Sequence, residues 1–137
     1  MKKYVVLLFI IGVTYCSFSQ ISEHNFDEKV EISVKLDYVL YTPHGYENSQ
    51  EDFPLIVFLH GAGERGTDLS KVSVHGPLQY IREGNKINAV ILAPQCPEGV
   101  YWQPHEVAAL VKNVIKEKRI DSNRVYLTGL SMGGYGV

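Results

Sequence analysis

Three short stretches of nearly continuous apolar sequence constrain the fold of this chain more than any other feature. They read PLIVFLHG (54–61), NAVILAPQ (88–95) and RVYLTG (124–129), and each stops at a glycine or a proline. Strict alternation would indicate strands with one wet face, whereas continuous apolar runs of this length are typical of strands covered on both faces. They predict central strands of a mostly parallel sheet with helices on both sides.

The segments between these runs carry helix signals. Residues 103–119 place Pro104 in the first turn and basic residues near the end, and their apolar side chains recur at helical spacing: Val107, Leu110, Val111, Val114 and Ile115. GPLQYIREG (76–84) predicts a short helix opened by Pro77 and stopped at Gly84. The order of elements predicts a doubly wound α/β fold, in which ligands bind at the carboxyl ends of the strands.

The sequence before the first apolar run has a different pattern. VEISVKLDY (30–38) alternates apolar and polar residues, which predicts a half-buried strand in an antiparallel pair at a sheet edge. YVLYTP continues as a second short strand, closed by Pro43. The fold class is therefore a mostly parallel sheet with antiparallel N-terminal strands.

Residues 1–19 have the three parts of a secretory signal peptide. Two lysines precede the apolar run YVVLLFIIGV (4–13), and SFS (17–19) provides a small-x-small cleavage site after Ser19. As a helix, the apolar run would span only about 15 Å, half of a bilayer core, which disfavours a membrane anchor. A lipoprotein anchor at Cys16 is disfavoured by the bulky tyrosine directly before it. We expect a secreted or periplasmic protein.

Composition limits the partners and cofactors that this chain can have. It has 137 residues, a net charge of −2 and no run of five like charges, so nucleic acid and, after signal cleavage, membranes are not expected partners. Only Cys96 is left once the leader is cut, so stability has to come from a packed core. No metal-ligand spacing and no phosphate-loop lysine motif is present, and we predict no cofactor and no metal site. The oligomeric state stays open.

The stretch GLSMGG (129–134) directly follows the last apolar run. In a nucleophile elbow, a serine lies on a sharp strand-to-helix turn, and the residues two before and two after it must be small. Ser131, Gly129 and Gly133 fit that pattern, and a following helix would direct its positive end at the serine. The alternative is a glycine-rich turn with a solvated serine. The strand-then-helix context favours Ser131 as a nucleophile.

A second glycine-rich stretch, LHGAGERGTD (59–68), follows the first apolar run. Acyl transfer creates an oxyanion that needs two backbone N–H donors aimed at one point. The pattern predicts Met132, directly after the nucleophile, as one donor and Ala62 as the other. Gly61 and Gly63 would let this backbone approach the substrate closely. The alternative is an ordinary glycine turn.

Other polar residues of this loop have two interpretations each. His60 could support the loop or be a structural histidine with its hydrogen bonds satisfied. Glu64, Arg65 and Asp68 could hold the loop through a salt bridge or be solvated charges.

Trp102 follows the second central strand and could line an acyl or sugar pocket, although packing explains it equally well.

Taken together, LHGAGERGTD, PQCPEG and YLTGLSMGGYG resemble the secreted α/β-hydrolases of the carboxylesterase, dienelactone-hydrolase and prolyl-oligopeptidase-like group, from about Val30 to Val137. The resemblance implies Ser131 as nucleophile, with Met132 and Ala62 forming the oxyanion hole. It also implies an aspartate and then a histidine after the serine in chain order.

The sequence departs from the family pattern at this point, because the six residues after Ser131 contain neither an aspartate nor a histidine. All five histidines precede Ser131, and an upstream histidine is the less favoured alternative for the base. We expect residues 20–137 to be the N-terminal part of an α/β-hydrolase domain in a longer gene product. The 137-residue chain alone is expected to be inactive.

The predicted function is that of a secreted serine hydrolase that acts on carboxylic esters of small molecules or carbohydrates through an acyl-enzyme at Ser131. A prolyl-oligopeptidase-like peptidase is one alternative. A non-catalytic binding domain on a hydrolase scaffold is another, since a fold does not imply a function. Cys96 is a weaker candidate nucleophile, because no base is spaced for it and prolines surround it.

Overall fold

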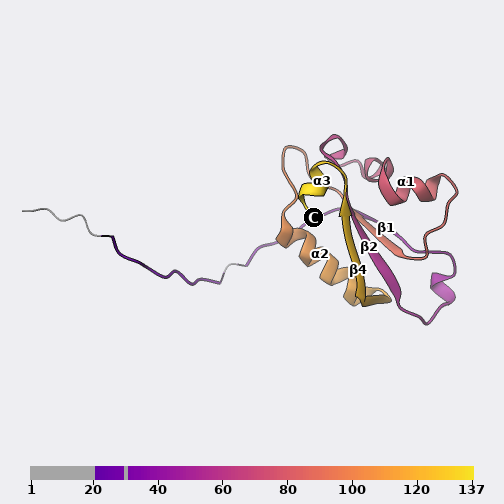
Figure 1. Cartoon of the computed structure of the whole chain (residues 1–137), viewed down its shortest axis with the longest axis horizontal. Helices are drawn as coiled ribbons and strands as arrows, with labels where there is room; N and C mark the ends of the chain where they lie inside the picture. The colour runs from indigo at the N-terminus through magenta and orange to yellow at the C-terminus, as the bar shows by residue number, and fades with distance from the viewer. Residues whose placement is uncertain (1–20, 30) are drawn as a thin grey trace, which may run out of the picture. The chain divides into compact units, whose positions relative to one another are not determined.

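The computed structural model describes residues 21–29 and 31–137. The chain divides into a unit of residues 1–31, whose described part contains no helix or strand, and a unit of residues 32–137 that contains the secondary structure (Figure 1). The predicted signal peptide, residues 1–19, lies outside the described residues. Within the described ranges, no helix is long and apolar enough to cross a membrane.

Four strands form one mixed sheet, in the spatial order β1-β3-β2-β4. β2 (Phe53–Leu59) runs parallel to both of its neighbours, β3 (Val90–Pro94) and β4 (Ile120–Gly129). β1 (Tyr38–Tyr41) pairs antiparallel with β3 at one edge. The three predicted central strands are present, and the α/β class is confirmed.

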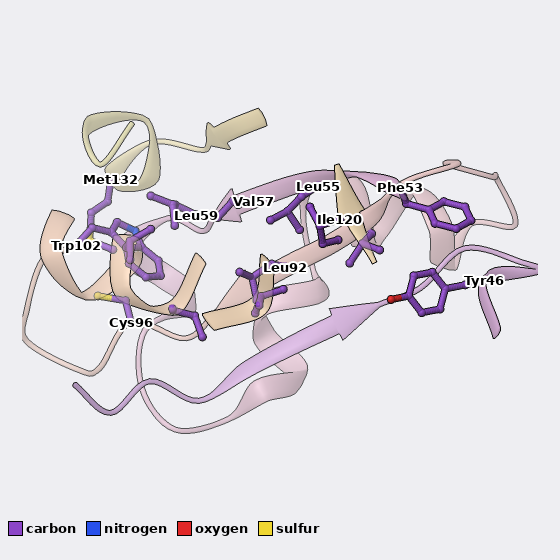
Figure 2. Close-up of a cluster of buried hydrophobic side chains, with 14 residues drawn as sticks. Tyr46, Phe53, Leu55, Val57, Leu59, Leu92, Cys96, Trp102, Ile120 and Met132 are labelled. Carbon is purple, nitrogen blue, oxygen red and sulfur yellow. The ribbon is translucent and has the colours of Figure 1, made fainter. Parts of the chain in front are cut away.

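Helices cover both faces of this sheet. α2 (Pro104–Glu117) lies over one face, where its apolar side chains join those of the central strands in one cluster (Figures 1 and 2): Val107, Leu110, Val114, Leu55, Val57, Leu59, Val90 and Leu92. α1 (Gly76–Arg82) and the 3-10 turn η3 (Leu69–Ser73) cover the other face, packing on Ile91 and Ala93. Because successive side chains of a strand point to opposite faces, a strand in this position must be apolar at every residue.

β4 is less buried than its sequence predicts. Both β2 and β3 are buried over most of their length, whereas most residues of β4 are exposed, among them Tyr126 and Leu127. β4 pairs only with β2 among the described strands, so one of its edges has no described partner. The prediction that residues 124–129 are covered on both sides is therefore wrong for the described part of the chain.

The prediction of a strand over residues 30–38 is also wrong for residues 31–37, because these residues form no strand. Val30 lies outside the described residues. A strand needs a backbone partner, and the register of β1 on β3 pairs Tyr38 with Pro94, the last residue of β3. One further hydrogen bond, from the Gln95 N–H to the Asp37 carbonyl, ends this pairing. The second predicted strand, YVLYTP, is confirmed as β1.

The strand order brings three loops to one edge of the sheet. β2 lies between β3 and β4, and the three strands are parallel, so their carboxyl ends point the same way. The chain leaves β2 toward β3, and then crosses back over β2 to reach β4. A reversal of this kind opens a crevice between the loops that follow the strands, and ligands bind there in doubly wound folds.

The difference in burial between two leucines of the sheet predicts a difference in stability between their alanine variants. Leu92 in β3 is fully buried, whereas Leu127 in β4 is 39% exposed. We expect Leu92→Ala to lower the free energy of unfolding by about 2–5 kcal/mol, because it leaves a cavity that the sheet cannot close. Leu127→Ala makes the same chemical change and should cost about 1 kcal/mol or less. Urea denaturation of both variants tests this, and equal losses would contradict the described burial.

Candidate active site

Ser131 lies on a strained turn between β4 and the short helix α3 (Met132–Tyr135). Its backbone angles are φ 52° and ψ −114°, and it is the one non-glycine residue with a positive φ in the described part of the chain. A side-chain-bearing residue in this region costs about 1–3 kcal/mol, which the surrounding structure must supply. Ser131 is exposed, so the turn presents its hydroxyl to solvent at the carboxyl edge of the sheet.

Two glycines let the backbones around this turn meet. A Cβ on Gly129 would lie 2.3 Å from the carbonyl carbon of Gly133, and a Cβ on Gly133 would lie 1.9 Å from the carbonyl oxygen of Leu59. Real Cβ atoms do not approach backbone this closely. The requirement for small residues two before and two after the serine therefore has a structural cause in this chain.

Backbone hydrogen bonds hold the turn in place. The Leu130 N–H donates to the Leu59 carbonyl at 3.0 Å, which continues the β2–β4 pairing past the end of β4. The Gly133 N–H donates to the Leu130 carbonyl at 2.8 Å. The Met132 side chain is buried in the core cluster (Figure 2), while its N–H, in the first turn of α3, has no acceptor within its own helix.

The loop after β2 lies beside the serine. A Cβ on Gly61 would be 3.7 Å from the Ser131 Cβ and 3.6 Å from the Leu130 carbonyl oxygen. Gly61 leads into the 3-10 turn η2 (Ala62–Glu64), whose first N–H belongs to the exposed residue Ala62. The structure thus brings Gly61 and Ser131 together, and the two predicted N–H donors are the residues that directly follow them. Nothing lies within 4 Å of a Cβ on Gly63, so this position faces open space.

His60 is buried below that loop, and both of its ring nitrogens are engaged. Nδ1 lies 2.7 Å from the Gly61 carbonyl oxygen, and Nε2 accepts a hydrogen bond from the Cys96 N–H at 3.0 Å. This pattern fits a neutral ring that carries its proton on Nδ1. Burial lowers the pKa of His60, and the nearby Arg65 charge acts in the same direction, although the Gly61 hydrogen bond and Glu64 oppose the shift. His60 supports the loop and does not contact Ser131 by a hydrogen bond.

Hydrogen bonds join the Gly61–Gly66 loop to the loop after β3. Gln95 donates from Nε2 to the Glu64 carbonyl, and the Gly66 N–H donates to the Cys96 carbonyl at 3.0 Å. Arg65 donates from Nε to the Ala62 carbonyl at 3.1 Å and from Nη1 to the Val100 carbonyl at 3.2 Å. Sequence reasoning missed Gln95 and this use of Arg65. The sequence signal that could have identified Gln95 is its position, directly after the apolar run that ends at Pro94.

Trp102 packs against the same histidine. It is 8% exposed, its ring lies edge-on to the His60 ring at 4.9 Å, and its Nε1 donates to the His60 carbonyl at 3.1 Å. Figure 2 shows Trp102 within the buried cluster. These contacts account for the residue by packing and hydrogen bonding. A role in substrate binding stays a prediction, and the neighbouring Tyr101, 70% exposed, is the more accessible aromatic side chain.

The charged residues of the loop do not pair with one another. Glu64 lies 3.6 Å from the His75 ring nitrogen, and Asp68 accepts from the Ser70 N–H at the start of η3. Cys96 is buried, and burial raises the pKa of its thiol, which fits a structural role. Among the described residues, no histidine is hydrogen-bonded to Ser131, and no cluster of three metal-binding side chains occurs.

Comparison with known proteins gives one line of evidence. No family model and no curated protein matches this chain. Six chains of solved structures do, and among them is the crystal structure of a thermostable esterase, with 34% identity and a TM-score of 0.59. The match covers 75% of this chain but only 32% of the esterase, so the chain spans about a third of that protein's length. The likeness supports an esterase-type α/β fold for the matched part.

The two glycines of α3 make a matched pair for testing the turn. A Cβ on Gly133 would overlap the Leu59 carbonyl, whereas a Cβ on Gly134 would make an ordinary contact, 3.7 Å from the Gly129 carbonyl oxygen. We expect Gly133→Ala to lower the free energy of unfolding by about 3 kcal/mol. Gly134→Ala should stay within about 1 kcal/mol of the wild type, because alanine favours a helix. Chemical denaturation compares the two, and equal stabilities would contradict the close approach.

The buried neutral histidine makes stability depend on pH. Burial lowers the pKa of His60 in the folded protein below the ordinary histidine value of 6.5. As the pH falls, the unfolded chain therefore binds a proton at this residue at a higher pH than the folded protein does. The free energy of unfolding should therefore fall as the pH drops from about 7.5 through about 6. His60→Gln should reduce this pH dependence of the free energy of unfolding. His44→Gln, at an exposed histidine, should leave the pH dependence unchanged. Denaturation at several pH values measures the slopes.

Proposed function

We propose that this protein is a serine hydrolase that acts on carboxylic esters, with Ser131 as the nucleophile. The strained φ of Ser131 carries the proposal, because a side chain held in this conformation where a strand meets a helix is the geometry of a nucleophile elbow. The structural similarity to a thermostable esterase supports ester over peptide substrates. We include export in the proposal, on the signal-peptide pattern of residues 1–19.

The reaction would proceed in two halves. In the first, the Ser131 Oγ attacks the ester carbonyl carbon, its proton passes to a base, and the alcohol leaves with a proton returned by that base. In the second, water attacks the acyl-enzyme in the same way and releases the acid. The exposed position of Ser131 at the end of β4 leaves room for the acyl group.

The N–H groups of Ala62 and Met132 would stabilise the oxyanion of both tetrahedral intermediates. Each is the first N–H of a helical turn and so has no acceptor within its own helix. Removing one such donor typically lowers the rate by about 10²–10³. The peptide that carries the Ala62 N–H also carries the Gly61 carbonyl, and the His60 Nδ1 contact to that carbonyl oxygen holds the peptide plane.

The base has to come from a group other than His60, because both nitrogens of that ring are already engaged. The family resemblance assigns the role to a histidine that follows the serine in chain order, with an aspartate between them. Within the described residues no histidine is hydrogen-bonded to Ser131, and activity is therefore measured on the product of the whole gene.

The nucleophile is tested by two serine substitutions on β4 and its turn. Ser131→Ala should reduce hydrolysis of 4-nitrophenyl butyrate about 10⁴-fold or more and abolish labelling by a fluorophosphonate probe. Ser122→Ala, at an exposed serine near the start of β4, should leave both unchanged. Labelling that persists in the Ser131→Ala variant would overturn the proposal.

The same assay separates the alternative functions. A prolyl-oligopeptidase-like enzyme would cleave proline-containing peptides but not short 4-nitrophenyl esters. A non-catalytic binding domain would turn over neither substrate and would not be labelled by the probe. Ester hydrolysis that depends on Ser131 excludes both.

A further inference from the structure

The carboxylate of Glu64 lies beside the proposed nucleophile. Its Oε2 is 3.0 Å from the position that a Cβ on Gly61 would take, and the Ser131 Cβ is 3.7 Å from that same position. Both side chains therefore lie close to Gly61, Glu64 from the loop after β2 and Ser131 from the turn after β4. The proposed chemistry gives Glu64 no role.

Glu64 is held in this place by its backbone and its side chain. Its N–H donates to the Gly61 carbonyl at 3.4 Å, and its own carbonyl accepts from Gln95. Its other carboxylate oxygen, Oε1, lies 3.6 Å from the His75 ring nitrogen. The Glu64 side chain is only 16% exposed, against 46% for that of His75, so the carboxylate is fixed and largely withdrawn from water.

The neighbouring basic side chains do not fully neutralise the negative charge of the Glu64 carboxylate. His75 is positive only when it is protonated. Arg65, the next residue, uses its guanidinium on the carbonyls of Ala62 and Val100, and within the described residues no ion pair joins it to Glu64. A substrate that binds at Ser131 would therefore lie near a fixed negative charge.

We propose that Glu64 determines specificity by selecting neutral acyl groups and rejecting acyl groups that carry a carboxylate. This inference rests on the proposed esterase function of Ser131. A fixed charge that is partly withdrawn from water repels a like charge more strongly than an exposed one does, because less solvent screens it. Repulsion of the wrong substrate separates two ligands without any added contact to the right one.

The test compares two esters with the same leaving group. 4-Nitrophenyl butyrate has a neutral acyl chain, and 4-nitrophenyl hemisuccinate has an acyl chain of the same carbon number that ends in a carboxylate. In the product of the whole gene, Glu64→Gln should raise the hemisuccinate-to-butyrate ratio of kcat/KM about tenfold, the size expected for removing one like-charge repulsion at a partly screened site. An unchanged ratio would overturn the proposal.

Two control variants separate specificity from a bracing role. His75→Gln keeps the Glu64 carboxylate but removes its ion-pair partner, so the ratio should stay at or below the wild-type value. If Glu64 only braced the loop through His75, both variants would change the two esters together and leave the ratio alone. Glu47→Gln removes a charge from an exposed residue in the 3-10 turn η1 (Tyr46–Asn48), which precedes β2 at the opposite end of that strand, and should not alter the ratio.

Failure of the inference is distinguishable from failure of the proposed function. If neither ester is hydrolysed and Ser131 is not labelled, the function itself is wrong. If both esters are hydrolysed through Ser131 and the Glu64→Gln ratio equals that of the wild type, the function stands and the role of Glu64 is refuted.

Discussion

The backbone contact between Gly133 and the end of β2 is the constraint on which the rest of the site depends. With no Cβ at Gly133 or Gly129, the first turn of α3 can lie directly on the Leu59 carbonyl and on the end of β4. That contact forces a sharp reversal within two residues, and Ser131 takes the strained φ that results. The strain is held by β2–β4 pairing and by the buried Met132 side chain, which are global features of the fold.

The second half of the site is positioned by a polar network centred on the buried His60. His60 lies below the Gly61–Gly66 loop and links it to Cys96, while Gln95 and Arg65 bind further carbonyls of the same two loops. Burial favours the neutral ring, so both of its nitrogens can be used with defined roles, one donating and one accepting. A loop held in this way has a fixed surface, which both the proposed oxyanion donor at Ala62 and the proposed role of Glu64 require.

Much of the fold could be predicted from local pattern. The runs around Val57 and Leu92 are apolar at almost every residue because both faces of β2 and β3 are covered, and α2 follows its 3.6-residue period closely. The errors fell at the sheet edges. Residues 31–37 alternate like a strand but have no partner to pair with, because β3 ends at Pro94. β4, which pairs with one described strand, is largely exposed although its sequence is apolar near its end. Pairing is a tertiary property, and the side-chain pattern of one segment does not contain it.

The sequence by itself determined the α/β class, the strand ends that carry loops, and the serine with a glycine two positions to either side. These follow from residue type and spacing, since only glycine permits the close backbone approach and only continuous apolar runs suit a sheet covered on both faces. Only the tertiary structure decided that Gly61 meets Ser131, that His60 is a buried support, and that the Glu64 carboxylate lies close to the Ser131 side chain. Those contacts join loops about 36–70 residues apart in the chain, which parallel strands bring to one edge of the sheet.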